Sequence, residues 1–447
     1  MKPMYKIIVL GLGLLTSTHG LGQVNSFTLE EAKAHALEHH LDIIKSQGNV
    51  DIAQQQIVET RGIGLPQIDF TGQFNHFINI PVSVVEASLF NPAAPPDEIL
   101  EFRMGQEFSA SGTLQVNQLL FNGSYIVGLQ AMKYVKRFQE SAYMATKEDV
   151  VFNVIQAYQL ATIAKGNIVF ADSMVILTEQ MVEAQQHYFD LDLILQEDMD
   201  QLNYSLLTTR NAALSAQVQY ENALNLLKFS MGYSMSEDID ISESAEQLLS
   251  KTTLSSGDIK NNIQYSLAQQ NVTLTKLDVK NTKFDNLPSL YAFFSQAYNA
   301  YRNEFNFFAD ERWYPQTVWG LQLNVPIFSG LQRHSRTKQK KIKLMQDQNA
   351  VEQLERALQF QEIQTKNNLR AAKDKFELQS ENTALAKMIY TNALEVKDIG
   401  KGNSIVVTQK HNQMMMAQAQ YLGSLMELFQ AQLELDKLYN EILSKNQ

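Results

Sequence analysis

Four stretches of the chain alternate between apolar and polar residues, and this period of two predicts β-strands. The stretch 68–77 sets Ile68, Phe70 and Phe74 against polar neighbours, and the stretches 108–119 and 319–327 alternate in the same way. The fourth stretch, 290–301, is rich in aromatic residues, and its apolar face is not evident. Such strands fit a wide transmembrane barrel with lipid outside and water inside. A half-buried sheet in a soluble domain gives the same pattern, so both interpretations stay open.

Most of the remaining chain is predicted to be helical. A first helix, 28–61, begins with a capping-box pair, Thr28 and Glu31, and has a counterpart at 258–285. The stretches 124–190 and 331–397 contain no proline. Each could form one continuous helix roughly 100 Å long, although a break near Lys165 in the first stretch is not excluded.

A second long helix is predicted after each of these stretches. Apolar and small residues recur in it at alternating steps of four and three, which predicts coiled-coil packing. The predicted seams consist of Leu202, Leu206, Thr209, Ala213, Ala216, Tyr220, Ala223 and Leu227 in the first helix and of Met415, Ala419, Leu422, Met426, Phe429 and Leu433 in the second.

One ten-residue motif occurs twice in the chain. Residues 114–123 read LQVNQLLFNG and residues 321–330 read LQLNVPIFSG. In each copy a strand leads into a phenylalanine, a glycine and a long helix, so Phe121 and Gly123, and Phe328 and Gly330, should form the junctions between sheet and helices. We interpret the chain as an internal duplication, with a first structural repeat at 23–250 and a second at 251–447.

The first 22 residues have the features of a secretory signal peptide. Lys2 and Lys6 precede an apolar run at 7–15, and small residues follow up to Gly22. The apolar run is shorter than the roughly 20 residues that a transmembrane helix needs. No later apolar run is long enough either, so we expect an exported chain without a helical membrane span. The predicted loops 78–105 and 301–315 are long, aromatic and proline-bearing, as in the extracellular loops of membrane barrels.

Composition narrows the range of functions. The net charge of −11 argues against a nucleic-acid partner, and the absence of cysteine excludes disulfides and thiol-linked lipids. The sequence contains no phosphate-binding loop and no catalytic motif that we recognise, so we expect neither an enzyme nor a cofactor. The run Met414–Met416 could bind a soft metal, but packing is the favoured explanation. Four histidines lack metal-ligand spacing and are expected at the surface: His39, His40, His187 and His411.

Four strands are too few to close a membrane barrel. Their edges would be left bare in lipid, and the smallest barrels of this kind have about eight strands. The chain must therefore assemble with other copies if it forms a barrel, and three copies would supply about twelve strands. The strand count alone requires assembly without fixing the number of subunits.

The order of helix, Leu-Pro, strand, loop, strand, Phe-x-Gly and two long helices, found twice, resembles the TolC family of outer-membrane efflux proteins. The resemblance extends from about residue 27 to the C-terminal end, and the stretch 401–404 (KGNS), followed by Ala417, Ala419 and Leu422, also fits. It implies a mixed, mostly α-helical homotrimer. A transmembrane β-barrel of four strands per chain would continue into a periplasmic coiled-coil barrel of helices.

The resemblance also implies a function and a location. The trimer would be a passive exit duct in the outer membrane of a Gram-negative cell, in contact with outer-membrane lipid. It would serve tripartite efflux or type I secretion, receiving cargo from an inner-membrane pump through a periplasmic adaptor protein. The alternative is an exported coiled-coil adaptor or structural protein without a membrane barrel.

Three groups of residues are candidate sites on this interpretation. The turns between the paired long helices should form the adaptor-docking tip, with Asp190, Asp192, Gly400, Gly402 and Ser404. Acidic residues beside the first turn could form a negative rim at the tunnel mouth, although solvated helix ends explain them equally well: Glu197, Asp198 and Asp200. The corresponding stretch 405–409 carries no carboxylate, unlike some members of the family. Basic residues after each junction could contact lipid headgroups or be solvated: Lys133, Lys136, Arg137, Arg333, Arg336, Lys338, Lys340, Lys341 and Lys343.

Overall fold

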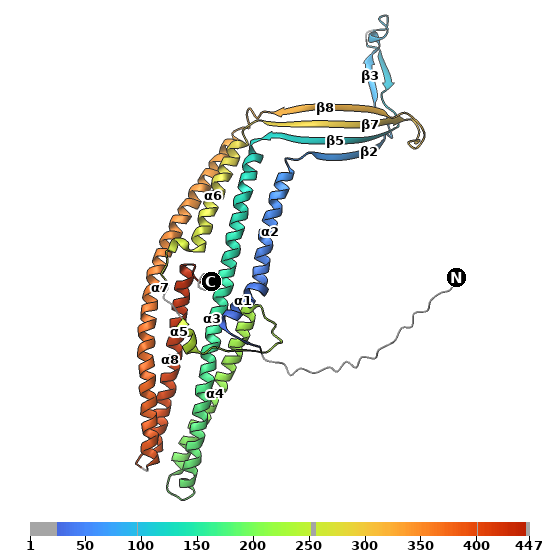
Figure 1. Ribbon diagram of the computed structural model, residues 1–447. Coiled ribbons are helices and arrows are strands. Elements are labelled where there is room, and N and C mark those ends of the chain that lie inside the picture. The colour runs from blue at the N-terminus through green and yellow to red at the C-terminus, as the bar shows by residue number, and fades with distance from the viewer. Residues whose placement is uncertain (1–24, 96, 252–255, 400, 444–447) are drawn as a thin grey trace, which may run out of the picture.

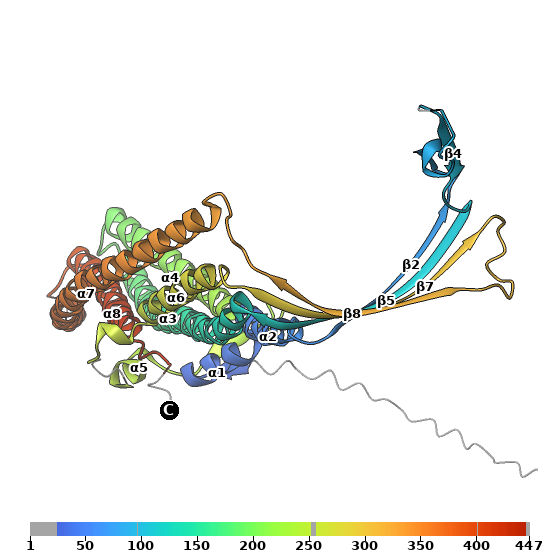
Figure 2. The same cartoon turned by 90° about the horizontal axis from the view of Figure 1, so that it is seen from above.

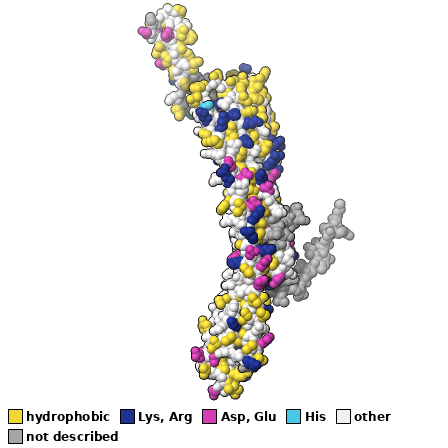
Figure 3. Space-filling view, turned by 90° about the vertical axis from the view of Figure 1, so that its left-hand side faces the viewer, with side chains coloured by type: hydrophobic (Ala, Val, Ile, Leu, Met, Phe, Trp, Pro, Cys, Tyr) yellow, Lys and Arg dark blue, Asp and Glu magenta, His cyan; other side chains and the backbone are white. Residues whose placement is uncertain are grey.

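The protomer is a long bundle of helices with a curved sheet that extends sideways from one end of it (Figure 1). The structure is a computed structural model that describes residues 25–95, 97–251, 256–399 and 401–443. The predicted signal peptide lies outside the described residues. Hydrophobic side chains gather over the sheet end and again at the opposite tip of the bundle, with charged side chains between them (Figure 3).

The main sheet has four antiparallel strands in the order β2-β5-β7-β8. These strands are β2 (Gln67–His76), β5 (Phe108–Asn122), β7 (Ser289–Arg302) and β8 (Tyr314–Asn324). The sheet is open, because β2 and β8 lie at its two edges, and it is curved when seen from above (Figure 2). The four predicted strands are therefore present in one sheet.

The register of the strands separates an apolar face from a polar one. Phe70 lies opposite Leu114, and Phe294 lies opposite both Val116 and Trp319. Because residues directly opposite each other share a face, Phe294 belongs to the apolar face, which the sequence of β7 did not reveal. Most polar residues of β2 and β5 fall on the other face, including Thr71 opposite Thr113, although Gln296 of β7 and Thr317 of β8 lie on the apolar face, in line with Leu114.

Two long helical hairpins form most of the bundle. In the first, α3 (Gly123–Phe189) is followed by α4 (Gln196–Met231), and in the second α7 (Gln332–Asp398) is followed by α8 (Ser404–Leu438). Both α3 and α7 contain 67 residues and run unbroken, so α3 has no break at Lys165. At ~1.5 Å per residue each spans on the order of 100 Å, as predicted.

Shorter helices brace the upper halves of α3 and α7. Helix α2 (Leu41–Gly62) packs against α3, and α6 (Ile263–Phe284) packs against both α3 and α7. The predicted helix 28–61 is interrupted, because α1 (Leu29–His39) ends at His40, whose ψ of 127° is not helical. His40 then caps α2, since its Nδ1 accepts a hydrogen bond of 3.2 Å from the backbone N–H of Asp42. The capping box of Thr28 and Glu31 is confirmed.

Halfway along the bundle the chain forms a waist, made of β1 (Asn25–Phe27), β6 (Ile239–Ile241), α1 and α5 (Ala245–Lys251) around α3. Strands β1 and β6 pair in parallel, with Phe27 opposite Ile241. The Tyr158 hydroxyl on α3 donates a 2.8 Å hydrogen bond to the Phe27 carbonyl, and Lys165 Nζ lies 2.7 Å from the Asp240 carboxylate. These contacts attach the first strand to the segment that joins the two halves of the chain.

In the second half of the chain, the first and last segments also contact each other. The 3₁₀ turn η2 (Ile259–Asn261) precedes α6, and the Asn262 side-chain amide donates a 3.0 Å hydrogen bond to the Leu438 carbonyl. Ile259 and Tyr439 belong to one buried cluster. The beginning and the end of the second half therefore also lie together.

The predicted loop 78–105 contains a small hairpin of its own. Strands β3 (Val82–Glu86) and β4 (Ile99–Arg103) pair in antiparallel register, with the 3₁₀ turn η1 (Ala87–Leu89) after β3. This hairpin projects from the far end of the main sheet (Figure 1). The segment 82–86 is short, and its alternation is too weak to separate it from a loop in the sequence alone.

One helix has the length and composition of a membrane span, contrary to our expectation. Within α3 an 18-residue window reaches a mean hydropathy of 1.5, and a third of that window is buried in the protomer. A helix that packs against other helices meets the same criterion. Because α3 packs against α1, α4 and α8, we attribute its apolar character to helix packing.

Candidate functional site

The two free edges of the main sheet are the first notable surface of the protomer. Strand β2 has 10 residues and β8 has 11, and both are edge strands. Because each neighbouring pair of strands is antiparallel, β2 and β8 run in opposite directions. The edge of β8 in one copy can therefore pair with the edge of β2 in another copy in the same antiparallel pattern.

Exposed apolar residues on the two hairpins form the second notable surface. On α3 and α4 they recur at steps of seven, with Val169 and Ile176 on α3 and Leu207 and Leu214 on α4, each at least 55% exposed. On α7, Leu378 and Leu385 are also seven residues apart and are 65% and 53% exposed. Apolar heptad stripes in a single protomer are typical of helices that pack against further helices.

The two copies of the repeated motif form different junctions. At the first, α3 begins directly at Gly123, and the Asn122 side chain accepts a 2.9 Å hydrogen bond from the Tyr125 backbone N–H. A Cβ on Gly123 would lie 2.8 Å from the Phe284 carbonyl oxygen, so this glycine permits close packing on α6. At the second, Gly330 and Leu331 both have positive φ, 58° and 67°, before α7 begins.

The phenylalanines of the two motifs differ accordingly. Phe121 lies in β5 opposite Leu290, whereas Phe328 lies outside any strand and is 82% exposed. The predicted strand 319–327 ends at Asn324, because Pro326 has no N–H to donate to a neighbouring strand. The expectation of two equivalent junctions is therefore wrong in detail.

The turn between α3 and α4 lies at the tip of the first hairpin, as predicted. Asp190 accepts a 2.8 Å hydrogen bond from the Gln186 side chain, and Asp192 has a positive φ of 54°. The sequence analysis overlooked the apolar residues of this turn. Three leucines occupy every second position of this turn and are 65–71% exposed: Leu191, Leu193 and Leu195.

The turn between α7 and α8 forms the second tip, and the prediction that Ser404 faces a partner needs correction. Gly400 lies outside the described residues. Gly402 has no positive φ; its lack of a side chain matters because a Cβ would lie 2.7 Å from the Lys397 backbone nitrogen. Ser404 is buried and donates a 3.1 Å hydrogen bond to the Gln185 side chain of α3. Ser404 thus joins the two hairpins instead of facing a partner.

The predicted acidic rim lies in the first turn of α4. The Leu195 backbone N–H lies 3.4 Å from the Asp198 carboxylate, and the Gln196 side chain donates a 2.8 Å hydrogen bond to Asp200. Glu197 and Asp198 also face the positive end of the helix dipole. Local capping therefore accounts for part of this acidic cluster.

His411 is buried, whereas the sequence analysis placed it at the surface. Its side chain is 1% exposed, and Nε2 lies 3.0 Å from the Thr209 hydroxyl on α4. Burial lowers the pKa of His411. The buried positions of α8 also differ from the predicted seam, because Ala419 is exposed while Ala417 and Met414 are buried. Met414 belongs to one buried cluster with Met174 and Leu202. The positions Thr408, His411, Met414 and Ala417 follow the helical period, which was the missed signal.

The basic residues that follow the second junction mostly pair with acids. Arg333 donates a 2.8 Å hydrogen bond to the Asp285 carbonyl, and Lys340 Nζ lies 2.7 Å from the Asp278 carboxylate. These contacts join α7 to α6. Part of the cluster thus has a role within the protomer.

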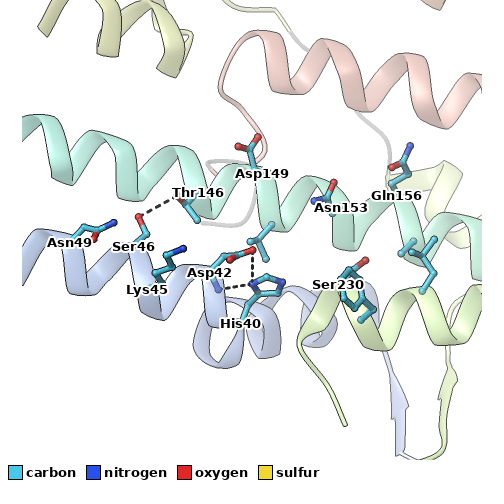
Figure 4. Close-up of a pocket in the computed structure, with 14 residues that line it drawn as sticks. His40, Asp42, Lys45, Ser46, Asn49, Thr146, Asp149, Asn153, Gln156 and Ser230 are labelled. Atoms are coloured by element: carbon cyan, nitrogen blue, oxygen red, sulfur yellow. Dashed lines mark hydrogen bonds and ion pairs between the residues drawn. The ribbon is translucent and has the colours of Figure 1, made fainter. Parts of the chain in front are cut away.

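A polar cavity of about 540 Å³ lies between α2, α3 and the end of α4 (Figure 4). Most of its labelled side chains come from α2 and α3, including Asn49, Asn153 and Gln156, and Ser230 comes from α4. Thr146 donates a 3.2 Å hydrogen bond to Ser46 at one end. The lining combines amides and hydroxyls with four titratable side chains, His40, Asp42, Lys45 and Asp149.

Comparison with known proteins identifies the fold. No protein-family model matches the sequence, and no curated protein matches it. Solved structures do match. The outer membrane protein VceC from Vibrio cholerae is 13% identical, with a TM-score of 0.69 over 92% of this chain and 95% of that one. The Campylobacter jejuni outer membrane channel CmeC is 15% identical, with a TM-score of 0.67 over 98% and 94%.

The structure of CusC, described in terms of transmembrane channel formation, gives a TM-score of 0.72 at 15% identity over 93% of this chain and 91% of that one. The chain therefore has the fold of the outer-membrane channels. This fold agrees with the resemblance to the TolC family that the sequence motifs indicated. Of these similar structures, CusC and CmeC are described in terms of channels.

Proposed function

We propose that the chain is one protomer of a homotrimeric channel in the outer membrane of a Gram-negative cell, serving as the exit duct of a tripartite efflux or type I secretion system. The observation that carries this proposal is the open four-stranded sheet with one apolar and one polar face, attached to two 67-residue helices. An open sheet in lipid leaves its edge groups unpaired, so closure with other copies is required.

Three copies supply about twelve strands, within the range of known membrane barrels. In this assembly β8 of each protomer pairs with β2 of the next, and Phe70, Phe294 and Trp319 face lipid. The polar residues, such as Thr71, Thr113 and Asn299, then line a water-filled pore. Trp319 is 78% exposed and Phe70 is 73% exposed in the protomer, and lipid supplies the apolar surroundings that water does not.

The helices continue the duct into the periplasm. The exposed stripes on the two hairpins, with Leu214 on α4 and Leu385 on α7, would be covered when neighbouring protomers close a tube of helices. We infer that the two halves of the chain arose by duplication, because each contains a bracing helix, two sheet strands and a long helical hairpin in the same order. The duplication lets three chains supply six similar hairpins.

The tip of the hairpins is the proposed docking site for a periplasmic adaptor that connects the duct to an inner-membrane pump. Exposed Leu191, Leu193 and Leu195 support this assignment beside Asp190 and Asp192, because exposed apolar residues at a helical tip suit a protein partner. Gly402 keeps the second turn compact. The acidic residues Glu197, Asp198 and Asp200, brought together from three chains, would give the mouth a negative potential.

The alternative, an exported coiled-coil adaptor without a barrel, explains the helices. It leaves the apolar face of the sheet in water, with Phe70, Trp319 and Leu321 all more than 60% exposed. The channel is therefore the better proposal.

Fractionation and mass measurement test this function. We expect the protein in detergent extracts of the outer membrane, with a native mass of three chains. The Leu214→Glu substitution should weaken the trimer, whereas Ser215→Glu, at the adjacent exposed polar position on the same helix, should not. A stable monomer in detergent, or a protein found only in the soluble periplasmic fraction, would overturn the proposal.

A further inference from the structure

The loop 303–313 between β7 and β8 folds back over its own sheet. The Phe305 ring lies 5.7 Å from that of Phe74 on β2 and 6.2 Å from that of Phe108 on β5. The Phe307 ring lies 5.6 Å from Phe74 and 6.5 Å from the Trp313 ring. The loop therefore crosses β5 and reaches the far edge strand β2, instead of extending away from the end of the sheet.

These contacts place the loop on the apolar face. Phe74 lies opposite Ala110, four residues along β2 from Phe70, and side chains four residues apart in a strand point to the same side. Phe108 lies opposite both His76 and Arg302 and belongs to the same face. We call this group of rings the aromatic pad; it consists of Phe74, Phe108, Phe305, Phe307, Phe308 and Trp313.

The pad is ordered by a buried arginine at the end of β7. Arg302 is 7% exposed, and its guanidinium donates hydrogen bonds of 3.0 Å to the Tyr301 carbonyl and 3.1 Å to the Arg312 carbonyl. Its Nε lies 2.9 Å from the Glu311 carboxylate. The Arg312 guanidinium in turn lies over the Tyr314 ring, 5.5 Å from its centroid. These contacts hold the returning part of the loop against the sheet.

Three of the six rings are nevertheless largely uncovered by protein, and the other three are less exposed. Phe74 is 51%, Phe305 62% and Phe308 95% exposed. A loop meant only for water would not present so many apolar rings, because their hydration is unfavourable. Aromatic side chains at one end of an apolar strand face are typical of the boundary between hydrocarbon and headgroups.

We propose that the aromatic pad is an interfacial anchor whose partner is the lipid of the outer membrane, at the headgroup level of the leaflet remote from the helices. This inference rests on the proposed channel function. Trp319 lies about 17 Å along β8 from Tyr314, at ~3.4 Å per residue. With a strand tilt of about 40° this distance is roughly 13 Å of depth, half of the ~25 Å apolar band of a membrane barrel. Trp319 should therefore lie near the bilayer centre when the pad lies at its surface.

The chain contains only two tryptophans, Trp313 and Trp319, so their fluorescence measures both depths directly. The experiment uses the purified full-length protein in phosphatidylcholine vesicles whose acyl chains carry bromine either near the headgroup or near the bilayer centre. In the Trp319→Phe variant, which retains Trp313, we expect stronger quenching by the shallow bromine. In the Trp313→Phe variant, which retains Trp319, we expect stronger quenching by the deep bromine.

Two further variants test the role of the pad. Replacing Phe305 and Phe307 with Ser in the Trp319→Phe background should shift Trp313 emission to longer wavelength and weaken its quenching by the shallow bromine. Phe90→Ser, which removes a 70% exposed ring from the separate β3–β4 hairpin, should leave both unchanged.

The possible failures are distinguishable. If Trp319 is quenched by the deep bromine while Trp313 is quenched only by aqueous iodide, the pad lies in water and the anchor proposal is wrong, although the channel proposal stands. If neither bromolipid quenches Trp319, the sheet does not enter the bilayer, and both proposals are wrong.

Discussion

His411 on α8 and Thr209 on α4 form a buried hydrogen bond of 3.0 Å between the two long hairpins of the protomer. The Thr209 hydroxyl already donates a 2.9 Å hydrogen bond to the Ser205 carbonyl. The proton between Thr209 and His411 must therefore come from His411 Nε2. Within the described part of the chain, Nδ1 has no hydrogen-bond partner.

This arrangement predicts that acid weakens the folded protein through His411. Burial lowers the pKa of His411 below its ordinary value of 6.5, so the unfolded chain takes up this proton at a higher pH than the folded chain. Well above pH 6.5 His411 is neutral in both states and does not affect the free energy of unfolding. This free energy falls as pH drops from 6.5 towards the pKa of His411 in the folded chain. At one pH unit below 6.5 the loss is at most about 1.4 kcal/mol per protomer.

Thermal unfolding in detergent at neutral and at mildly acidic pH measures this effect. His411→Gln retains an amide donor towards Thr209 but cannot titrate, so its melting temperature should fall less on acidification than that of the wild type. His187→Gln, at an exposed position on α3, is the matched control and should behave like the wild type. An unchanged acid response in His411→Gln would contradict this prediction.

Glu148 on α3 should have the opposite pH dependence. Its side chain is 2% exposed, and burial raises its pKa from 4.5 to about 7. The folded chain therefore binds this proton more tightly than the unfolded chain. Stability is greatest below pH 4.5 and falls as pH rises to about 7, by up to ~3 kcal/mol per protomer.

Glu148→Gln should accordingly raise the melting temperature at about pH 8 and change it little at about pH 4.5, where the wild-type carboxyl is protonated in the folded chain and about half protonated in the unfolded chain. Glu183→Gln removes an exposed carboxylate from the same helix and should change the melting temperature little at either pH. Equal stabilisation by Glu148→Gln at both pH values would show that packing, and not ionisation, is responsible.

Substitution of Gly402 should impair transport without preventing assembly. A Cβ at this position would lie 2.7 Å from the Lys397 backbone nitrogen and 2.8 Å from its Cα, so the turn between α7 and α8 must open. We expect Gly402→Trp to abolish efflux in cells and Gly402→Ala to reduce it, with the native trimer mass and outer-membrane insertion retained. Gly423→Ala on α8, where a Cβ meets no atom within 4 Å, should transport normally. Wild-type efflux by Gly402→Trp would argue against a docking role for this turn.

The acidic residues at the start of α4 should influence ion flow if they form a rim. Replacing Asp198 and Asp200 with Asn removes two charges per chain, six in a trimer, and should reduce cation selectivity and cation block in single-channel recordings. As a control, Glu237 and Asp238, which lie between α4 and β6, are replaced with Gln and Asn, so that the same number of charges is removed. That control should leave selectivity unchanged. If Asp198 and Asp200 can be neutralised without effect, their role is limited to capping α4.

The elements with a strong local period could be predicted from the sequence. The alternation in 68–77 and 108–119 gave strands β2 and β5 to within a few residues, and the absence of proline gave the two 67-residue helices. For the aromatic stretch 290–301 the sequence predicted a strand but did not show which of its faces is apolar. Only its pairing with β5 and β8 shows that Phe294 belongs to the apolar side.

Features that depend on tertiary contacts could not be predicted in this way. The break at His40 has no proline or glycine to mark it, and the three-residue strands β1 and β6 depend on each other for pairing. Ser404 looked like an exposed turn residue, and only the packing of α8 against α3 buries it on Gln185. The leucines at 191, 193 and 195 were overlooked because the acidic residues around them suggested a solvated turn.

The closure of each half at the waist has a consequence for how such a chain can arise. Phe27 pairs with Ile241 in the first half, and Asn262 bonds to Leu438 in the second, so each half begins and ends at nearly the same place. An ancestral gene encoding a single half could therefore be copied in tandem and fused with a very short connection, without rebuilding either unit. Under the proposed duplication and trimer, the two halves made as separate polypeptides should still meet in their native positions, and the ancestral duct would be a ring of six half-length chains.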